Sequence, residues 1–173
     1  NTPFGNLDSD KNLVESLLKE KVEIKDSAMG LEHGVFTEIP FIKNFFPNVK
    51  VVPLILKSAN DFEKYFAFGE KINQLSDENS ILIVSSDFSH NATPEKAKSN
   101  DKKSISALNN LSKDSIADVE SDCKQCLAVL SGFLGDSLSY NFNLLANKNS
   151  FDISGQEKDS VTSYVSGFYA KKD

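Results

Sequence analysis

The chain has 173 residues, of which 39% are hydrophobic and 25% charged, so it is long enough to bury the core of one soluble globular domain. Its formal net charge of −6 argues against a general nucleic-acid partner and against an anionic membrane surface. No apolar stretch approaches the roughly 20 residues that span a bilayer, and no secretory signal is recognisable, so the cytoplasm is the expected compartment.

Apolar periodicity predicts helices and strands in alternation through the first half of the chain. Helices are expected from a cap at Asp8 or Ser9 to about Lys19, across 32–46 with an interruption at Pro40, and from a cap at Asn60 or Asp61 to about Leu75. The expected strands are 22–24 and 49–56, the second limited by Pro53 because proline donates no ladder hydrogen bond.

The second half begins with an apolar run, 81–84, that is typical of a buried strand. Helical patterns follow at 95–112 and 114–121, and an apolar helix at 127–134 is expected to break at Gly132 and Gly135. Two strands, 140–145 and 161–169, joined by a turn at 154–156, complete the pattern. Helices between apolar strands predict an α/β layer architecture.

Polar residues follow the 81–84 run at once, at the strand end where an open α/β sheet carries its chemistry. Asp87 and His90 both fall there, three positions apart. A carboxylate and an imidazole at this spacing can act as metal ligands, or as a base and its orienting partner. Spacing alone favours a simpler interpretation, in which Asp87 caps a turn and His90 is a surface residue, because short Asp/His pairs recur by chance.

Two further places carry candidate chemistry. Glu32 at the start of a predicted helix complements the helix dipole, and His33 would add a second imidazole to the Asp87/His90 site if the two segments are neighbours. Cys123 and Cys126 form a Cys-x-x-Cys motif, which occurs in redox dithiols and in halves of zinc sites. The chain has only two cysteines, so the favoured interpretation is that both are inert residues of a helix. A place for Cys123 in the Asp87/His90 site is the next alternative, and a thioredoxin-like role for the pair comes last.

Four motifs occur in one order along the chain: Glu32-His33-Gly34, Ile39-Pro40-Phe41-Ile42, Val51-Val52-Pro53-Leu54-Ile55 and Ser85-Ser86-Asp87-Phe88-Ser89-His90. This order resembles the Memo-like family, whose bacterial and archaeal members are called AmmeMemoRadiSam system protein B. Further similar segments extend the resemblance over nearly the whole chain: Thr2-Pro3-Phe4-Gly5, Cys123, Asp152-Ile153-Ser154-Gly155, Asp159-Ser160-Val161 and Tyr164-Val165-Ser166-Gly167.

The resemblance implies a three-layer α/β/α sandwich with a mixed sheet, similar to class III extradiol dioxygenases. Those enzymes hold ferrous iron with two histidines and one carboxylate, which leaves positions open for oxygen and substrate. Carried over by match, Asp87, His90 and Cys123 are the expected catalytic pocket residues. Asp87 and His90, with His33 as a weaker addition, are the expected metal ligands, and iron or copper is the expected metal.

The chain also departs from the family pattern. The family's P-H-A-G-Y segment and a second S-H-H-like motif, each with a pocket histidine, are not found, so residues 1–173 are expected to be a single Memo-like domain without the family's N-terminal segment. One expected function is a metal-dependent, oxidoreductase-like protein, which would need the missing histidines from another polypeptide segment. The alternative is a non-catalytic binding or scaffold domain that has lost pocket histidines and uses the old pocket for a small molecule or partner. The resemblance implies a radical-SAM enzyme and an AMMECR-like protein as partners.

Overall fold

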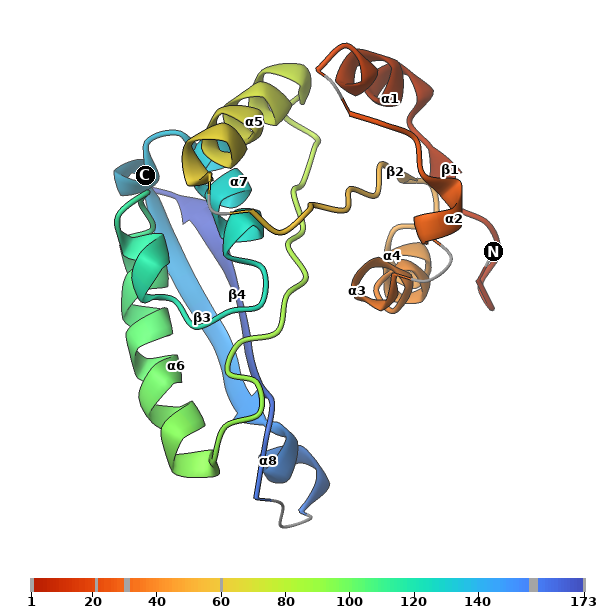
Figure 1. The fold of residues 1–173 in the computed structure, drawn as a ribbon. Helices are drawn as coiled ribbons and strands as arrows, with labels where there is room; N and C mark the ends of the chain where they lie inside the picture. Colours follow the sequence, from red (N-terminus) through yellow and green to blue (C-terminus); the bar gives the residue numbers. More distant parts are fainter. Residues whose placement is uncertain (1, 21, 30–31, 60, 156–158, 173) are drawn as a thin grey trace. The chain divides into compact units, whose positions relative to one another are not determined.

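The computed structural model describes the chain except for residues 1, 21, 30–31, 60, 156–158 and 173 (Figure 1). The chain divides into two compact units: Asn1–Lys57 with Leu75–Ser80, called the first unit, and Ser58–Gln74 with Ile81–Asp173, called the second unit. Both contain helices and strands, which confirms the α/β class. The strands of the described residues form two two-stranded sheets, so the three-layer sandwich with a mixed sheet stays a prediction, as does the single domain over 1–173. None of the helices in the described residues is long and apolar enough to cross a membrane.

The first unit holds a short parallel sheet, in which β1 (Asp8–Ser9) pairs with β2 (Lys50–Val51). Its helices are α1 (Lys11–Leu18), α2 (Asp26–Met29), α3 (His33–Phe36) and α4 (Ile39–Phe45). Because Asp8 and Ser9 belong to β1, the helix cap falls one residue later than predicted: the Asp10 carboxylate accepts a hydrogen bond from the Leu13 N–H at 3.1 Å. The predicted strand at 22–24 is wrong, since these residues adopt no regular structure.

Two prolines, which lack a backbone N–H, lie where a helix begins and where a strand ends in this unit. Pro40 lies in the first turn of α4, where a missing N–H costs nothing, so the pattern over 32–46 divides into α3 and α4 as predicted. Pro53 follows β2, which ends at Val51 instead of running through 49–56. Proline offers no donor to continue the ladder, which accounts for the early end of the strand.

The second unit is built from α5 (Phe62–Leu75), α6 (Pro94–Asn109), α7 (Lys124–Leu134), α8 (Ser150–Ser154) and the antiparallel pair of β3 (Tyr140–Asn149) and β4 (Ser163–Lys171). Figure 1 shows α6 lying along the β3–β4 hairpin, and α6 contacts both strands. Two 3-10 helices, η1 (Ser115–Asp118) and η2 (Ser137–Ser139), flank α7. The helix expected at 114–121 is reduced to η1.

The hairpin connection is longer and more regular than predicted. β3 runs four residues beyond its predicted end, β4 begins and ends two residues later than predicted, and α8 replaces a simple turn. Asn149 caps α8 and exchanges hydrogen bonds with Asp152 in a capping box, while Gly155 closes the helix at a φ of +67°. Gln156 of the predicted turn lies outside the described residues.

Glycine brings α5 and α7 together. A Cβ at Gly132 would lie 2.0 Å from the Phe66 carbonyl oxygen, and a Cβ at Gly69 would lie 2.0 Å from the Val129 carbonyl oxygen. The predicted break at Gly132 is therefore wrong: α7 continues through this residue because the missing side chain makes room for the neighbouring helix. The predicted break at Gly135 is confirmed, since α7 ends there at a φ of +66°.

The segment 81–84 differs most from the prediction. These residues form no strand; Ile81 is 78% exposed and Ile83 57% exposed. Leu82 and Val84 alternate with them as half-buried residues, and Val84 packs against the core. A strand requires a hydrogen-bonded neighbour, and in the described residues no strand pairs with this segment. The prediction of a buried strand at 81–84 is therefore wrong.

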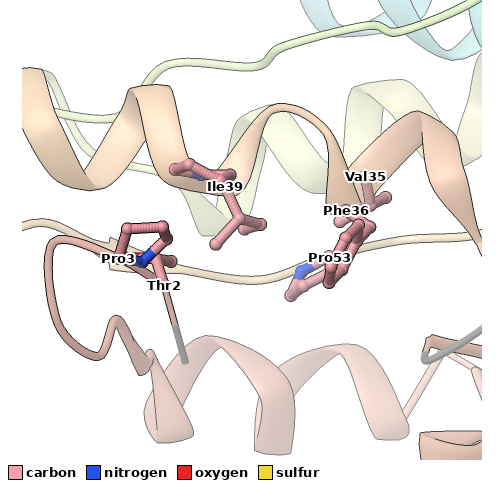
Figure 2. Close-up of a pocket in the computed structure, with 7 residues that line it drawn as sticks. Thr2, Pro3, Val35, Phe36, Ile39 and Pro53 are labelled. Carbon is pink, nitrogen blue, oxygen red and sulfur yellow. The ribbon is translucent and has the colours of Figure 1, made fainter.

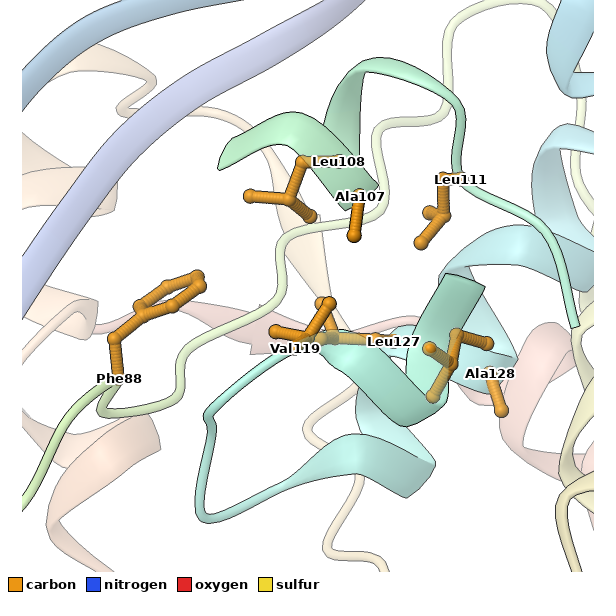
Figure 3. Packing of buried hydrophobic residues seen from close by; sticks show 8 residues of the cluster. Phe88, Ala107, Leu108, Leu111, Val119, Leu127 and Ala128 are labelled. Carbon is orange, nitrogen blue, oxygen red and sulfur yellow. The ribbon is translucent and has the colours of Figure 1, made fainter. Parts of the chain in front are cut away.

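The core of the second unit lies between α6, η1 and α7. Phe88, Leu108, Val119 and Leu127 belong to one buried cluster, to which the half-buried Tyr169 of β4 adds its ring. Figure 3 shows Phe88 together with Leu108 of α6, with Val119 and with Leu127 of α7. Burial of Phe88 anchors the backbone at the centre of the Ser85–His90 motif, which sets the position of its polar neighbours.

Candidate functional site

Residues 85–91, called the signature loop, are attached to the start of β4. The Phe88 N–H donates to the Ser163 carbonyl oxygen at 3.2 Å, and the Ser163 N–H donates to the Ser89 carbonyl oxygen at 2.8 Å. Just beyond the loop, Ala92 and Val161 exchange a second pair of backbone hydrogen bonds. The loop backbone is therefore held by main-chain bonds, although it belongs to no strand.

The two ionisable side chains of the signature loop converge. Asp87 Oδ2 lies 3.7 Å from His90 Nε2, and the side chains are 38% and 51% exposed respectively. Asn91 follows at a φ of +53°, a left-handed conformation that asparagine tolerates better than most residues, and the chain bends there. At this distance the carboxylate and the imidazole are too far apart for a direct hydrogen bond, but both can contact one cation or small ligand placed between them.

A second segment, Ser121–Cys123, supports the loop from 35 residues away. The Asp122 carboxylate accepts hydrogen bonds from the Ser86 hydroxyl at 2.8 Å and from the Asp87 N–H at 3.0 Å. In return, the Asp122 N–H donates to the Asp87 carbonyl oxygen at 3.1 Å. The hydroxyl oxygens of Ser121 and Ser86 lie 2.5 Å apart and share a further hydrogen bond. These bonds bring Cys123, the next residue, to the same region as Asp87.

Cys123 is the N-cap residue of α7, and its sulfur is bonded to that of Cys126. The structure therefore differs from the predicted pair of inert cysteines on one continuous helix: Cys123 precedes the helix, and in the described residues no cysteine is free. The assignment of Cys123 to the pocket stays a prediction. While the bond to Cys126 persists, its sulfur is not a thiolate and cannot bind a metal as one.

A buried polar network lies beneath the signature loop. The fully buried Ser163 hydroxyl donates to Asp101 Oδ1 at 2.6 Å and accepts the Ser89 N–H at 2.9 Å. The second carboxylate oxygen of Asp101 accepts from Asn147 Nδ2 at 2.7 Å. The Ser89 hydroxyl, also fully buried, has no partner among the described residues. The network fixes α6, β3 and β4 to the backbone of the loop.

Sequence reasoning missed both supporting groups. The signal for Asp122 was its place directly before Cys123, at the entry to an apolar helix, where an acidic residue can bond to nearby backbone N–H groups. Asp101 offered a weaker signal, as a carboxylate on the face of α6 that also carries the buried Ala97, Ser104 and Leu108. No pattern in the sequence points from Asp101 to Ser163, which is 62 residues away.

His33 belongs to the first unit, where it is the first residue of α3. Glu32 caps that helix with its carboxylate, which accepts the Gly34 N–H at 2.7 Å and confirms the predicted structural role at the helix start. His33 as a metal ligand stays a prediction. No group of three or more His, Cys, Asp and Glu side chains that could hold a metal occurs in the described part of the chain.

The first unit also contains a hollow of about 230 Å³ of different character. Figure 2 shows Thr2, Pro3, Val35, Ile39 and Pro53 around it, contributed by the N-terminal turn, α3, α4 and the segment after β2. Its lining carries no titratable side chain. The hollow can accommodate apolar groups but offers no acid, base or metal ligand, so the signature loop remains the candidate site.

The motifs around the signature loop define a domain of the Memo class, and comparison with known sequences confirms this. A family profile described as Memo-like protein matches residues 1–168, and the chain belongs to this family. It is 29% identical to a MEMO1 family protein of Methanosarcina mazei over 95% of this chain and 64% of the relative. MEMO1 family proteins of Methanobrevibacter smithii and Sulfurisphaera tokodaii are also 29% identical, over 97% and 95% of this chain and 63% and 62% of the relatives. The chain thus spans less than two thirds of the length of each of these relatives.

Proposed function

We propose that this Memo-like chain is a metal-binding, redox-related protein with an extradiol-dioxygenase-like pocket in which Asp87 and His90 are ligands. The approach of Asp87 Oδ2 to His90 Nε2 at 3.7 Å carries the proposal, because both groups can face one cation without a change of the loop backbone. Carboxylate and imidazole are ligands of iron and copper in proteins. A bound metal would supply Lewis-acid or electron-transfer chemistry, while the two side chains hold and orient it.

The donors fit such a metal in kind but not in number. A two-histidine, one-carboxylate site needs three protein ligands, and the signature loop supplies two. The candidates for the remaining position are His33 and a reduced Cys123. The proposal therefore expects weak binding by the Asp87/His90 pair alone and a measurable contribution from any third ligand.

Calorimetric titration of the 173-residue chain with Cu²⁺, and with Fe²⁺ under anaerobic conditions, tests the proposal. We expect Asp87→Asn and His90→Ala each to weaken binding by about tenfold or more, the effect of losing one of few ligands. Asp114→Asn is a matched control, because Asp114 is exposed in the same unit and its carboxylate caps no helix. His33→Ala tests His33 as the third ligand: a loss of metal affinity in this variant would support that role. Equal affinity in the wild type and in both loop variants would refute the role of the pair.

A second candidate function is a non-catalytic binding or scaffold domain. The observation in its favour is that the described residues bring only two metal-binding side chains together while the third, Cys123, is bonded to Cys126. For this function the Asp87/His90 pair would bind a small polar molecule or a partner protein. The same titrations separate the two functions, since the scaffold function expects no metal-dependent heat in any variant.

The partners proposed from the family are a radical-SAM enzyme and an AMMECR-like protein. Binding between purified proteins, measured with and without substitution at Asp87 and His90, tests this part of the proposal. The exposed position of both side chains supports a role in contact with another molecule.

A further inference from the structure

We propose that Cys123 and Cys126 form a thiol–disulfide exchange site that reacts with a low-molecular-weight thiol/disulfide couple. This redox activity needs no bound metal and goes beyond the proposed metal-binding function. The two sulfurs are bonded in the structure, and these are the only 2 cysteines of the chain. The pair can therefore exist in two oxidation states without any other cysteine of the chain taking part.

The position of the pair at the start of α7 favours a reactive thiolate. Cys123 is the N-cap of this 11-residue helix, and Cys126 lies in its first turn. Unpaired N–H groups at a helix N-terminus stabilise a thiolate, which is the nucleophile in exchange. The neighbouring Asp122 carboxylate opposes this effect, while its hydrogen bonds from the Ser86 hydroxyl and the Asp87 N–H direct it toward the signature loop.

The bond adds little to the structure of the helix that it joins. It links Cys123, just before the helix, to Cys126 in the first turn, and a loop this short gains little entropic stabilisation because that stabilisation grows with loop length. The buried Leu127, Ala128 and Val129 hold α7 in the core independently of the sulfurs. Reduction is therefore compatible with the fold. Both cysteines are half-buried, so that a small thiol can reach them.

The exchange step balances without any further reactant. The Cys123 thiolate attacks one sulfur of an oxidised couple RS–SR, forming a Cys123–S–S–R bond and releasing RS⁻, which takes up a proton from water. The Cys126 thiol loses its proton to water, and its thiolate attacks Cys123 Sγ, which forms the internal disulfide and releases the second RS⁻. Two electrons pass from the cysteine pair to the couple, which leaves as two RSH molecules, and the reverse sequence reduces the pair.

Equilibration of the metal-free 173-residue chain in reduced and oxidised glutathione, with chelator present, tests the proposal. After acid quenching and alkylation, mass spectrometry counts the free thiols at each ratio. We expect the two thiols to appear together over a range of glutathione ratios, as a two-electron couple in exchange with the buffer requires. A disulfide that stays intact in excess reduced glutathione, or a pair that stays reduced in excess oxidised glutathione, would refute exchange.

Single-cysteine variants test which sulfur attacks. In Cys126→Ser, only Cys123 remains, and we expect a stable mixed disulfide with glutathione because no resolving thiol is present. In the matched variant Cys123→Ser, we expect Cys126 to react at least about tenfold more slowly, since it lies within the helix rather than at its N-cap. Equal rates would contradict the assignment of Cys123 as the nucleophile. Because the glutathione experiment uses the unaltered chain without metal, its outcome is independent of the Asp87/His90 titrations.

Discussion

Replacement of Ser163 by alanine tests whether the buried polar network holds the signature loop. Ser163→Ala removes the acceptor of the Ser89 N–H, at 2.9 Å, and a donor to Asp101 Oδ1, at 2.6 Å. A buried N–H without a partner costs about 1–3 kcal/mol, and a hydrogen bond to a charged group contributes about 1.5–3 kcal/mol. We therefore expect a loss of about 3–5 kcal/mol in the free energy of unfolding, a large share of the roughly 5–15 kcal/mol of a typical domain.

Ser89→Ala is the matched control, because it removes the same hydroxyl group from a residue that is equally buried. The Ser89 hydroxyl has no partner among the described residues, so its loss breaks no hydrogen bond within them. We expect this variant to unfold within about 1 kcal/mol of the wild type, or to be slightly more stable, because an unsatisfied buried hydroxyl is unfavourable.

Urea unfolding followed by far-ultraviolet circular dichroism measures both changes, since the chain contains no tryptophan for fluorescence. An unchanged slope of free energy against urea would show that the substitutions alter stability rather than the denatured state. If Ser163→Ala and Ser89→Ala lost the same free energy of unfolding, the loss would come from the small cavity that each substitution leaves and not from the hydrogen bonds of Ser163. The buried network would then not be what holds the signature loop.

Two further substitutions test the packing of the second unit. Gly132→Ala places a Cβ 2.0 Å from the Phe66 carbonyl oxygen, so α5 and α7 must move apart. We expect urea unfolding to show a loss of about 3 kcal/mol or more in the free energy of unfolding. A loss below about 1 kcal/mol would contradict the close approach of the two helices. Burial raises the pKa of Tyr169, whose hydroxyl donates to the Leu108 carbonyl oxygen at 2.6 Å. The folded state therefore holds this proton more tightly than the unfolded state, and stability should fall as pH rises above about 10, the usual tyrosine value. Tyr169→Phe should remove that part of the pH dependence and cost about 1 kcal/mol at neutral pH; an unchanged alkaline profile would contradict the burial.

The sequence predicted best where local periodicity and local chemistry agree. The range of α5 agrees with its amphipathic pattern, and the Asp61 carboxylate accepts the Lys64 N–H at 3.3 Å as a capping residue should. The division at Pro40 follows from the missing N–H of proline alone. These features depend on residues within four positions of one another, so that no knowledge of the tertiary structure is needed.

Prediction failed where the outcome depends on residues far apart in the chain. An apolar run such as 81–84 becomes a strand only if another strand pairs with it, and no local pattern contains that information. Gly132 reads as a helix breaker in isolation, but it lies within α7 because α5 passes close by. In both cases the outcome depends on whether a distant segment packs against these residues, and intrinsic propensity does not carry that information.

In the candidate site too, contacts between residues close in the chain were predictable and contacts between distant residues were not. The proximity of Asp87 and His90 was predictable, because they lie three positions apart on one loop. The support of Asp122 from 35 positions away was not, and neither was the bond between Ser163 and Asp101. The spacing of Cys123 and Cys126 left several roles open, and the bond between their sulfurs is seen only in the structure.

In the signature loop, the main chain and Phe88 hold the loop in place while the ionisable side chains are left accessible, which supports a binding role for those side chains. Main-chain groups of the loop are bonded to Ser163 and Asp122, and the Phe88 ring is buried in the core. Asp87 and His90 take no part in this support with their side chains, which remain partly exposed and face each other. Tertiary contacts thus fix the backbone while the acid and the base stay accessible, an arrangement that lowers the entropic cost of binding a ligand between them.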